Sequence, residues 1–470
     1  MNLEQIISKI KKKYNNSFDL MFRTINTKNK KITLIYIDSL CDSNTINETI
    51  IKNIAQNPSF KNLEEVLTSP SIKKIKEEEI FEYLDNGCCI TIEKNQIISV
   101  ETKKNLSRNI TEPTIEQTIN GPKDSLNEDY ITNIGLIRKR IKTDTLTITE
   151  KKIGKKSKTK IGILYLKDIA EQELIDNVIE KMDKIDLDYV MDSTFISQCI
   201  VSNNDVFPLA ETTERPDLIC MSLLHGKIAI IVENSPFAIL VPTFFIDMFH
   251  SPEDYYQNPK NATFTRLIRL ISFYIAIILP AFYIAITTFN HETIPLTLIV
   301  NFAQQRNGVP FPTFIEAIGM ILIFEILRES DLRMPQVSGN AISILGAIVL
   351  GDAAVSAGIV SPIMVIVIAI SSICSLMFSH VSMVNAIRLW KLIFLIFASL
   401  LGIVGIVFSM FLFLIITTSI KSFGKPYLYP IAPLGKSKII DSFIVTNKNN
   451  QKQDPILNKN EVLKWKNIFS

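Results

Sequence analysis

The chain has 470 residues, long enough for two or three domains, and a formal net charge of +3. A charge this close to balance excludes a protein that binds nucleic acid through overall basicity. The charged side chains are segregated, because residues 270–391 contain only five Lys or Arg and residues 392–420 contain no charge. We therefore predict a membrane protein whose soluble region is formed by the first 266 residues.

The N-terminal stretch MNLEQIISKIKKKYNNSF lacks the apolar core of a secretory signal, so we expect the soluble region to stay in the cytosol. Four histidines are scattered along the chain without HExxH spacing, and no catalytic constellation is evident. We expect no enzyme, no cofactor and no metal site. Five cysteines of the soluble region show no zinc-binding spacing and are expected to be reduced: Cys41, Cys88, Cys89, Cys199 and Cys220.

The soluble region contains an internal repeat. KITLIYIDSL resembles KIGILYLKDI, with Tyr36 and Tyr165 in register and apolar residues alternating as in a half-buried strand. LDNGCCITIEKNQIISV around Gly87 resembles LLHGKIAIIVENSPFAILV around Gly226, and each predicts a helix end, a glycine cap and a β-hairpin. Two related α/β subdomains are favoured over a chance similarity between generic α/β patterns.

We predict an α/β fold for the soluble region, with subdomains at residues 1–115 and 121–260 divided near the polar segment 107–125. The stretch IGKKSKTK carries a Gly-Lys pair near a serine, as phosphate-binding loops do. A P-loop requires another glycine at position 149, which is Thr149 here, and a helix after the loop. A basic hairpin turn is therefore favoured over a nucleotide site.

Residues 266–421 are predicted to form an α-helical multi-pass membrane domain with about four spans and one short helix. Proline in GIVSP disfavours helix before it, so the long apolar run should turn there. Arg388, Trp390 and Lys391 are expected to mark a membrane interface before the last span. The four spans are predicted at residues 267–289, 337–359, 362–380 and 392–420.

The segment after residue 420 has nine lysines and three acids, and residues 422–470 form a basic C-terminal tail. Positive charge favours the cytosolic side, so the tail should lie on the same side as the soluble region. This arrangement requires an even number of membrane crossings.

Two acids interrupt the apolar stretch PFPTFIEAIGMILIFEILRES. Glu316 and Glu325 are nine residues apart, which places them on roughly opposite faces of a helix at about 100° per residue. An ionised carboxylate in hydrocarbon costs at least about 2.5–3.5 kcal/mol, so both need protein or water contact. One interpretation is a short helix enclosed on both sides within an assembly. The alternative is an amphipathic helix at the membrane surface, with Glu325 in water.

Small residues recur every three or four positions between residues 339 and 358 and form one face of a helix. Such faces allow close helix packing in lipid. Alternatively, symmetric copies of this helix surround a narrow pore that prefers cations. Both interpretations favour a homo-oligomer. The candidate pore or helix-packing residues are Gly339, Asn340, Ser343, Ala347, Gly351, Asp352, Val355 and Gly358.

Seven stretches in series resemble the A subunits of GerA-family spore germination receptors. They are TNIGLIRKRI, GKKSKTKIGILYLKDIA, ERPDLICMSLLHGKIAIIVENSPFAILVPT, SPEDYYQNP, NGVPFPTFIEAIGMILIFEILRESDLRMP, LGDAAVSAGIVSPIMVIVIA and KSFGKPYLYPIAPL. The family's membrane glutamates match Glu316 and Glu325, and its small-residue helix matches residues 339–358, whereas position 352 is variable in that family.

The resemblance implies a multi-pass protein of the spore inner membrane, with membrane lipid around it, and the near-balanced charge predicts no nucleic-acid partner. It implies that the chain acts with a permease-like B subunit that binds the nutrient and with a lipoprotein C subunit. It also implies an oligomeric ligand-gated ion channel that starts germination. The alternatives are a solute transporter, which would have inverted repeats and two broken helices, and a non-conducting scaffold for the B subunit.

Overall fold

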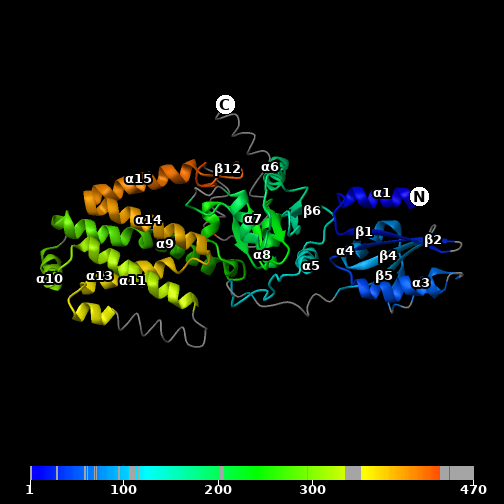
Figure 1. Cartoon of the computed structure of the whole chain (residues 1–470), viewed down its shortest axis with the longest axis horizontal. Helices are drawn as coiled ribbons and strands as arrows, with labels where there is room; N and C mark the ends of the chain where they lie inside the picture. Colours follow the sequence, from blue (N-terminus) through cyan, green and yellow to red (C-terminus); the bar gives the residue numbers. More distant parts are fainter. Residues whose placement is uncertain are drawn as a thin grey trace, which may run out of the picture.

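The computed structural model describes residues 3–433 and residue 444, with gaps at 28–29, 58–59, 61, 68, 70, 94–95, 105–112, 114–115, 202–205, 294 and 334–350. Two α/β units and a helical bundle follow one another along the long axis of the molecule (Figure 1). The second α/β unit lies between the first unit and the bundle. The predicted fold class, an α/β region followed by a helical domain, is confirmed.

The first α/β unit is built on an antiparallel sheet in the order β1-β2-β4-β5-β3. Both faces of the sheet are covered. Alternation along β2 sends Ile32 and Leu34 to one buried cluster and Ile35 and Ile37 to the other. The elements are α1 (Leu3–Lys13), β1 (Leu20–Thr27), β2 (Lys30–Ile37), α2 (Ser43–Ile46), α3 (Lys52–Gln56), β3 (Ile72–Lys74), α4 (Ile80–Asp85), β4 (Cys88–Glu93) and β5 (Gln96–Glu101).

The second α/β unit repeats this topology, because its sheet has the order β6-β7-β9-β10-β8. Tyr36 and Tyr165 lie in the second strand of their sheets. Gly87 and Gly226 each end a helix with positive φ, +77° and +84°, directly before a hairpin. The predicted pair of related subdomains is confirmed. The elements are α5 (Tyr130–Arg140), β6 (Leu146–Ile153), β7 (Thr159–Leu166), α6 (Gln172–Asp183), α7 (Ser193–Ile200), β8 (Glu211–Thr213), α8 (Pro216–Leu224), β9 (Ile228–Val232) and β10 (Ala238–Val241).

The basic stretch around Gly154 is the turn of a hairpin. β6 pairs with β7 from Leu146 opposite Leu166 to Ile153 opposite Thr159. Gly154 has φ +97°, a conformation that glycine adopts readily. The segment leads into a strand and no helix, so the prediction of a hairpin is confirmed.

A buried ion pair joins the two α/β units. Arg138 on α5 donates two hydrogen bonds to Asp19, at 2.6 and 2.8 Å, and a third to the hydroxyl of Ser17 at 2.9 Å. Both charged side chains are almost fully buried. Burial favours a higher pKa for Asp19, but the charge and hydrogen bonds of Arg138 outweigh it and hold the pKa below its ordinary value.

The helical bundle is formed around α9, which contacts α11, α13, α14 and α15. Among the described residues, α9 and α14 are long and apolar enough to cross a membrane, and α13 and α15 are shorter apolar helices. The helices are α9 (Pro259–Thr288), α10 (Leu296–Arg306), α11 (Thr313–Arg333), α13 (Pro362–Ser375), α14 (Val381–Leu401) and α15 (Ile403–Ser419). Of the predicted span 337–359, residues 337–350 lie outside the described residues.

The sequence predicted that the uncharged run 392–420 forms one span, and this is wrong. It is divided at Gly402, whose φ of +62° and ψ of −138° are outside the helical region. α15 folds back on α14, with the rings of Phe397 and Phe408 5.0 Å apart. Lack of charge gave no sign of this reversal, although glycine inside an apolar run commonly marks a break.

The expectation that Arg388, Trp390 and Lys391 precede a span is also wrong. α14 begins at Val381 and continues through all three. Trp390 is buried, with its ring 4.9 Å from that of Phe413. The break at GIVSP is confirmed, because Ser361 caps α13 directly before Pro362.

The second α/β unit and the bundle share one hydrophobic core. Phe245, which follows β10, packs edge to face against Phe273 of α9, with ring centroids 5.6 Å apart. Phe207 packs against Trp390 of α14 at 6.3 Å. Aromatic pairs of this kind contribute about 0.5–1.5 kcal/mol beyond their buried area. The soluble region and the bundle are therefore joined by packing as well as by the chain.

The segment after α15 returns to the second α/β unit. It contains the short pair β11 (Lys421–Ser422) and β12 (Lys425–Pro426). The hydroxyl of Ser422 donates to the carbonyl of Leu209 at 2.9 Å, and the N–H of Phe245 donates to the carbonyl of Tyr427 at 2.9 Å. The C-terminal end of α15 and the soluble region therefore lie on the same side of the bundle.

We expect Asp19→Ala to lower the free energy of unfolding of the soluble region by about 3–5 kcal/mol, because Arg138 would stay buried without a counter-ion. Hydrogen exchange of the β1 and α5 amides in the full-length protein, followed through a denaturant series, measures the change. The matched control is Asp144→Ala, which removes the exposed ion pair with Lys13 across the same interface and should cost less than about 1 kcal/mol. Equal losses in the two variants would contradict a dominant role for Asp19.

Candidate functional site

Glu316 lies in the first turn of α11 and is only 2% exposed. One carboxylate oxygen, Oε1, accepts hydrogen bonds from the backbone N–H and the hydroxyl of Ser361, each at 2.6 Å. Ser361 is the N-cap of α13, where the helix dipole favours a negative group. The second oxygen, Oε2, and the hydroxyl of Tyr283 on α9 are buried without a hydrogen-bond partner among the described residues.

Glu325 lies on the other face of α11 and is half-buried. Its Oε2 lies 2.9 Å from Nη2 of Arg388 on α14 and 3.3 Å from Nη2 of Arg328, one turn along α11. Glu316 therefore faces α13 and Glu325 faces α14. Of the two interpretations of this helix, enclosure describes Glu316, whereas Glu325 is partly exposed, and helices of the same chain supply the contacts of both acids.

The predicted small-residue face is only partly described. Gly339, Asn340, Ser343 and Ala347 lie outside the described residues, and residues 351–356 are helical. A Cβ atom on Gly351 would lie 3.8 Å from Cγ1 of Val365, so this glycine faces α13. Val355 packs in the same hydrophobic cluster as Val365, and the side chain of Asp352 is exposed. Gly358 has φ +67° and belongs to the turn before α13.

An acid–arginine cluster fixes the start of α9 to the soluble region. Asp254 is buried and accepts hydrogen bonds from both terminal nitrogens of Arg269, each at 2.7 Å. Nε of Arg266 donates to the same carboxylate at 3.2 Å. Burial favours a raised pKa for Asp254, but the hydrogen bonds and charges of the two arginines lower it, so the carboxylate is ionised. The cluster positions the first long apolar helix.

A second buried group joins β9 to the loop before α14. The ammonium of Lys227 lies 2.7 Å from Asp247 and 3.6 Å from Glu211. Nε2 of His380, the residue before α14, lies 3.8 Å from the same Glu211. Burial alone would lower the pKa of Lys227, but the two carboxylates raise it above its ordinary value. The soluble region thus contacts the start of α14 through Glu211 and His380, in addition to the ion pairs that hold α9.

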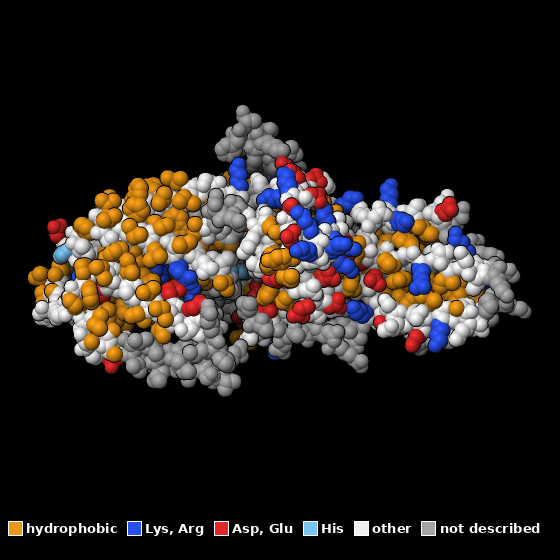
Figure 2. All heavy atoms as spheres, viewed as in Figure 1, with side chains coloured by type: hydrophobic (Ala, Val, Ile, Leu, Met, Phe, Trp, Pro, Cys, Tyr) orange, Lys and Arg blue, Asp and Glu red, His pale blue; other side chains and the backbone are white. Residues whose placement is uncertain are grey.

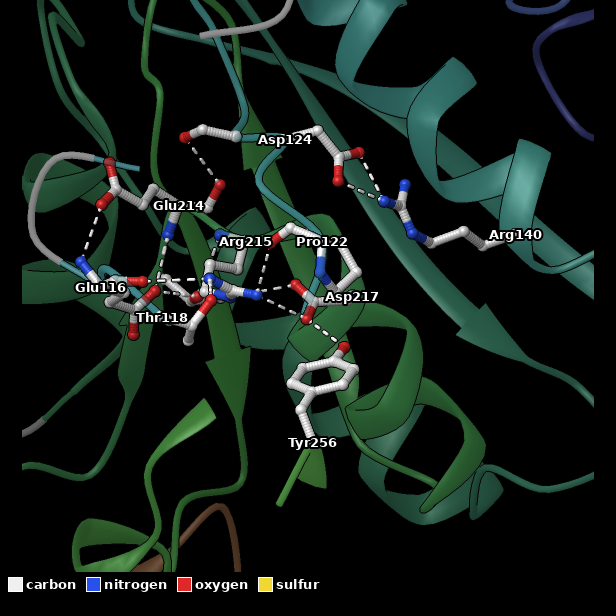
Figure 3. Close-up of polar contacts among 11 residues, drawn as sticks. Glu116, Thr118, Pro122, Asp124, Arg140, Glu214, Arg215, Asp217 and Tyr256 are labelled. Atoms are coloured by element: carbon white, nitrogen blue, oxygen red, sulfur yellow. Dashed lines mark hydrogen bonds and ion pairs between the residues drawn. The ribbon is translucent and has the colours of Figure 1, made fainter. Parts of the chain in front are cut away.

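A third cluster is centred on Arg215, whose side chain is fully buried (Figure 3). Its guanidinium donates to both carboxylate oxygens of Asp217, at 3.1 and 2.9 Å. The remaining donors bind the segment that connects the two α/β units. The acceptors are the carbonyl of Glu116 at 3.1 Å, the hydroxyl of Thr118 at 3.0 Å and the carbonyl of Pro122 at 2.9 Å.

The Arg215 cluster continues to the loop that holds α9. The hydroxyl of Tyr256 donates to Asp217 (Figure 3). The Tyr256 ring leaves no room for a side chain at Gly121, where a Cβ atom would lie 2.7 Å from Cδ2. Since Tyr256 is two residues from Asp254, contacts run from the connecting segment through Arg215 to the first helix.

Glu116 is the titratable group of this cluster. Oε2 accepts hydrogen bonds from the hydroxyl of Thr213 at 2.5 Å and from the N–H of Glu214 at 3.3 Å. Burial raises the pKa of Glu116 to about 7, against the opposing effect of these hydrogen bonds. Near neutral pH the carboxyl is therefore poised between its protonated and ionised forms.

Sequence reasoning singled out Glu316 and Glu325 but assigned no role to Asp254, Lys227 or Arg215. Lys227 offered a signal, because it directly precedes the apolar stretch IAIIV, whereas Arg215 and Asp254 lie in the polar stretches ERPD and SPED, where charged side chains are ordinary. Within the part of the chain that the structure describes, no three His, Cys, Asp or Glu side chains converge as metal ligands would. The clusters around Asp254, Lys227 and Arg215 connect the soluble region to the helical bundle.

Comparison with known proteins identifies a family. The family described as Bacillus/Clostridium GerA spore germination protein matches residues 8–457. Spore germination protein KA of Bacillus subtilis is 36% identical over 94% of this chain and 84% of its own length. Spore germination protein GerQA of Bacillus cereus is 32% identical over 94% of this chain and 89% of its own length. The N-terminal domain of the A subunit of the Bacillus megaterium spore germinant receptor GerK3 aligns with 52% of this chain and 96% of its own, at 24% identity and a TM-score of 0.40.

We expect the contact between the connecting segment and Arg215 to weaken as the pH rises from about 4.5 to about 7. The pKa of Glu116 is raised on folding, so its contribution is complete below the unfolded-state pKa and is lost as pH rises through the folded-state pKa. Amide exchange of residues 116–126, corrected for intrinsic rates, should accelerate across this window in the wild type. Glu116→Gln, which cannot ionise, should give a flat profile; identical profiles in both proteins would refute the assignment.

Replacing Glu316 by Ala should destabilise the bundle by about 1–3 kcal/mol, because the N–H and hydroxyl of Ser361 lose their acceptor in a buried place. Glu316→Gln keeps an acceptor oxygen and should cost less. Thermal unfolding of the detergent-solubilised protein, followed by size-exclusion chromatography, measures the difference. Glu292→Ala, at an exposed acid beyond the end of α9, is the control; a loss no larger than in this control would argue against the Glu316–Ser361 contact.

Proposed function

This chain belongs to the GerA spore germination protein family, as an A subunit of a spore germinant receptor, and from that premise we propose that it is the ion-conducting, ligand-gated subunit. In this proposal several copies surround a cation pathway in the spore inner membrane. A permease-like B subunit binds the nutrient, and a lipoprotein C subunit completes the receptor. Opening of the pathway releases cations and starts germination.

The observation that carries the proposal is the rigid junction between the soluble region and the bundle. Asp254 holds the first helix through two arginines, and Lys227 links β9 to the loop before α14 through Glu211 and His380. In this proposal a rotation of the second α/β unit moves α9 and α14 with it. Such coupling suits a soluble region that receives a signal from a partner and transmits it to membrane helices.

A route from these helices to the proposed pathway also exists. α9 and α11 pack against α13, and Glu316 on α11 binds the cap of α13 directly after the turn at Gly358. The small-residue segment ends at this turn. In an oligomer whose central helices are residues 337–359, displacement of α9 would act on the pathway through α13.

The return of residues 421–433 to the soluble region supports a common side for the head and the tail. Their contacts include the hydrogen bond from Ser422 to Leu209 and an ion pair between Lys425 and Glu171 at 2.5 Å. Together with the excess of lysine in the tail, this supports a cytoplasmic location for both.

A non-conducting scaffold for the B subunit is the alternative that the same rigid junction favours. It predicts nutrient-dependent signalling without cation flux through this chain. A transporter acting as a single unit would instead be expected to have two broken helices in matching positions.

Flux measurements with two substitutions at Gly351 separate these functions. Gly351→Ala places its methyl group at an ordinary contact distance from Val365 and should retain cation flux. Gly351→Leu overpacks the face, at a cost of about 1–3 kcal/mol, and should lower nutrient-triggered flux about tenfold or more. Proteoliposomes that contain the A, B and C subunits provide the assay. A monomeric wild-type protein, or flux that Gly351→Leu leaves unchanged, would support the scaffold.

A further inference from the structure

A group of charged side chains interrupts the hydrophobic surface of the helical bundle (Figure 2). It lies between α11 and α14 and consists of Glu325, Arg328, Arg388 and Lys391. Both arginines bind the carboxylate of Glu325 and remain partly exposed, Arg328 by 25% and Arg388 by 35% of the side chain. We call these four residues the basic cluster.

The charges of the basic cluster do not balance. Three basic side chains surround the carboxylate of Glu325, and the next acid of α11, Glu329, is exposed one turn further along the helix. Lys391 is only 5% exposed and has no hydrogen bond or ion pair within the described part of the chain. Nε of Arg388 is likewise buried without a partner there. A nearly buried ammonium without an acceptor is costly, so the cluster lacks an anionic partner.

The surroundings of the basic cluster indicate where that partner comes from. Large apolar side chains around it are exposed, including Leu322 and Ile326 on α11 and Leu389 on α14. The next residue, Trp390, packs against Phe207 of the soluble region. Arg388 and Lys391 lie in the second and third turns of α14, so the cluster lies on the half of the bundle that is nearer to the soluble region.

We propose that the basic cluster binds the headgroup of an anionic phospholipid. Phosphate oxygens would accept hydrogen bonds from Arg388 and Arg328 and approach the ammonium of Lys391, while Glu325 keeps the two guanidinium groups in place. Arginine suits phosphate because its planar donors match the oxygen geometry. The lipid tails would cover the exposed apolar side chains beside the cluster. This inference rests on the membrane placement in the proposed function but not on ion conduction.

A lipid fits better than an acid from another protein chain. The two arginine side chains are partly exposed on a surface that also exposes large apolar residues, as is common for side chains that reach a membrane interface. Basic pockets between membrane helices on the cytoplasmic side are typical sites for anionic headgroups. The proposed cytoplasmic location of the soluble region puts the cluster on that side.

The test compares retention of phosphatidylglycerol and phosphatidylcholine by the full-length protein in nanodiscs of mixed composition, measured by native mass spectrometry. The wild type should enrich phosphatidylglycerol. Arg388→Gln and Arg328→Gln should each lower the enrichment roughly fivefold, and Arg388→Lys should retain most of it. Lys260→Gln removes an exposed charge at the start of α9 and serves as the matched control, with enrichment unchanged.

Several results would overturn the proposal. They are equal retention of both lipids by the wild type, equal loss in Lys260→Gln and Arg388→Gln, and inorganic phosphate binding in detergent with the same affinity as the lipid. If Arg388→Gln instead dissociates an oligomer and leaves lipid retention unchanged, an acidic group of another copy covers the cluster. Arg328→Gln keeps the test open if Arg388→Gln fails to fold. Cation flux in pure phosphatidylcholine tests conduction separately, so the two proposals fail independently.

Discussion

The buried carboxylate of Asp254 is the contact on which the connection between the soluble region and the bundle depends. It is bound by Arg266 and Arg269, which lie one turn apart at the start of α9. Removing these charges from water is expensive, and only close, well-directed hydrogen bonds compensate for it. The pair therefore tolerates one orientation of α9 relative to the loop that carries Asp254. Packing of Phe245 against Phe273 on the next turns maintains that orientation.

Buried charged side chains also hold other parts of the chain together. Asp19 and Arg138 join the two α/β units, Arg215 binds the segment between them, and Glu316 joins α11 to α13. Buried charged groups of this kind add little net stability compared with apolar contacts, but leaving one of them without its partner is costly. Their distribution favours a chain in which neighbouring units move together, and this is a requirement for transmitting a signal over the length of the molecule.

Local patterns in the sequence predicted the units but not their connections. The strands of the repeat and the turn at GIVSP follow from alternation, glycine and proline, which act over a few residues. The reversal at Gly402, the burial of Trp390 and the return of residues 421–433 depend on partners more than one hundred residues away in some cases, as with Ser422 and Leu209. Periodicity contains no information about such partners. A lone charge in an apolar stretch was the usable signal, and it was followed only for the two acids of α11.

The interpretation of Glu316 and Glu325, two charges within an apolar helix, changes once the structure shows their partners. From sequence alone, two acids on opposite faces of an apolar helix argue for neighbouring copies that shield them. In the structure, the N-terminus of α13 binds Oε1 of Glu316 and Arg388 of α14 binds Glu325, so one copy supplies a partner to each acid, although Oε2 of Glu316 has none among the described residues. The acids therefore determine packing inside the bundle. The case for an assembly then depends on the small residues of segment 339–358, which allow close approach of helices, although Gly351 faces α13 of the same chain.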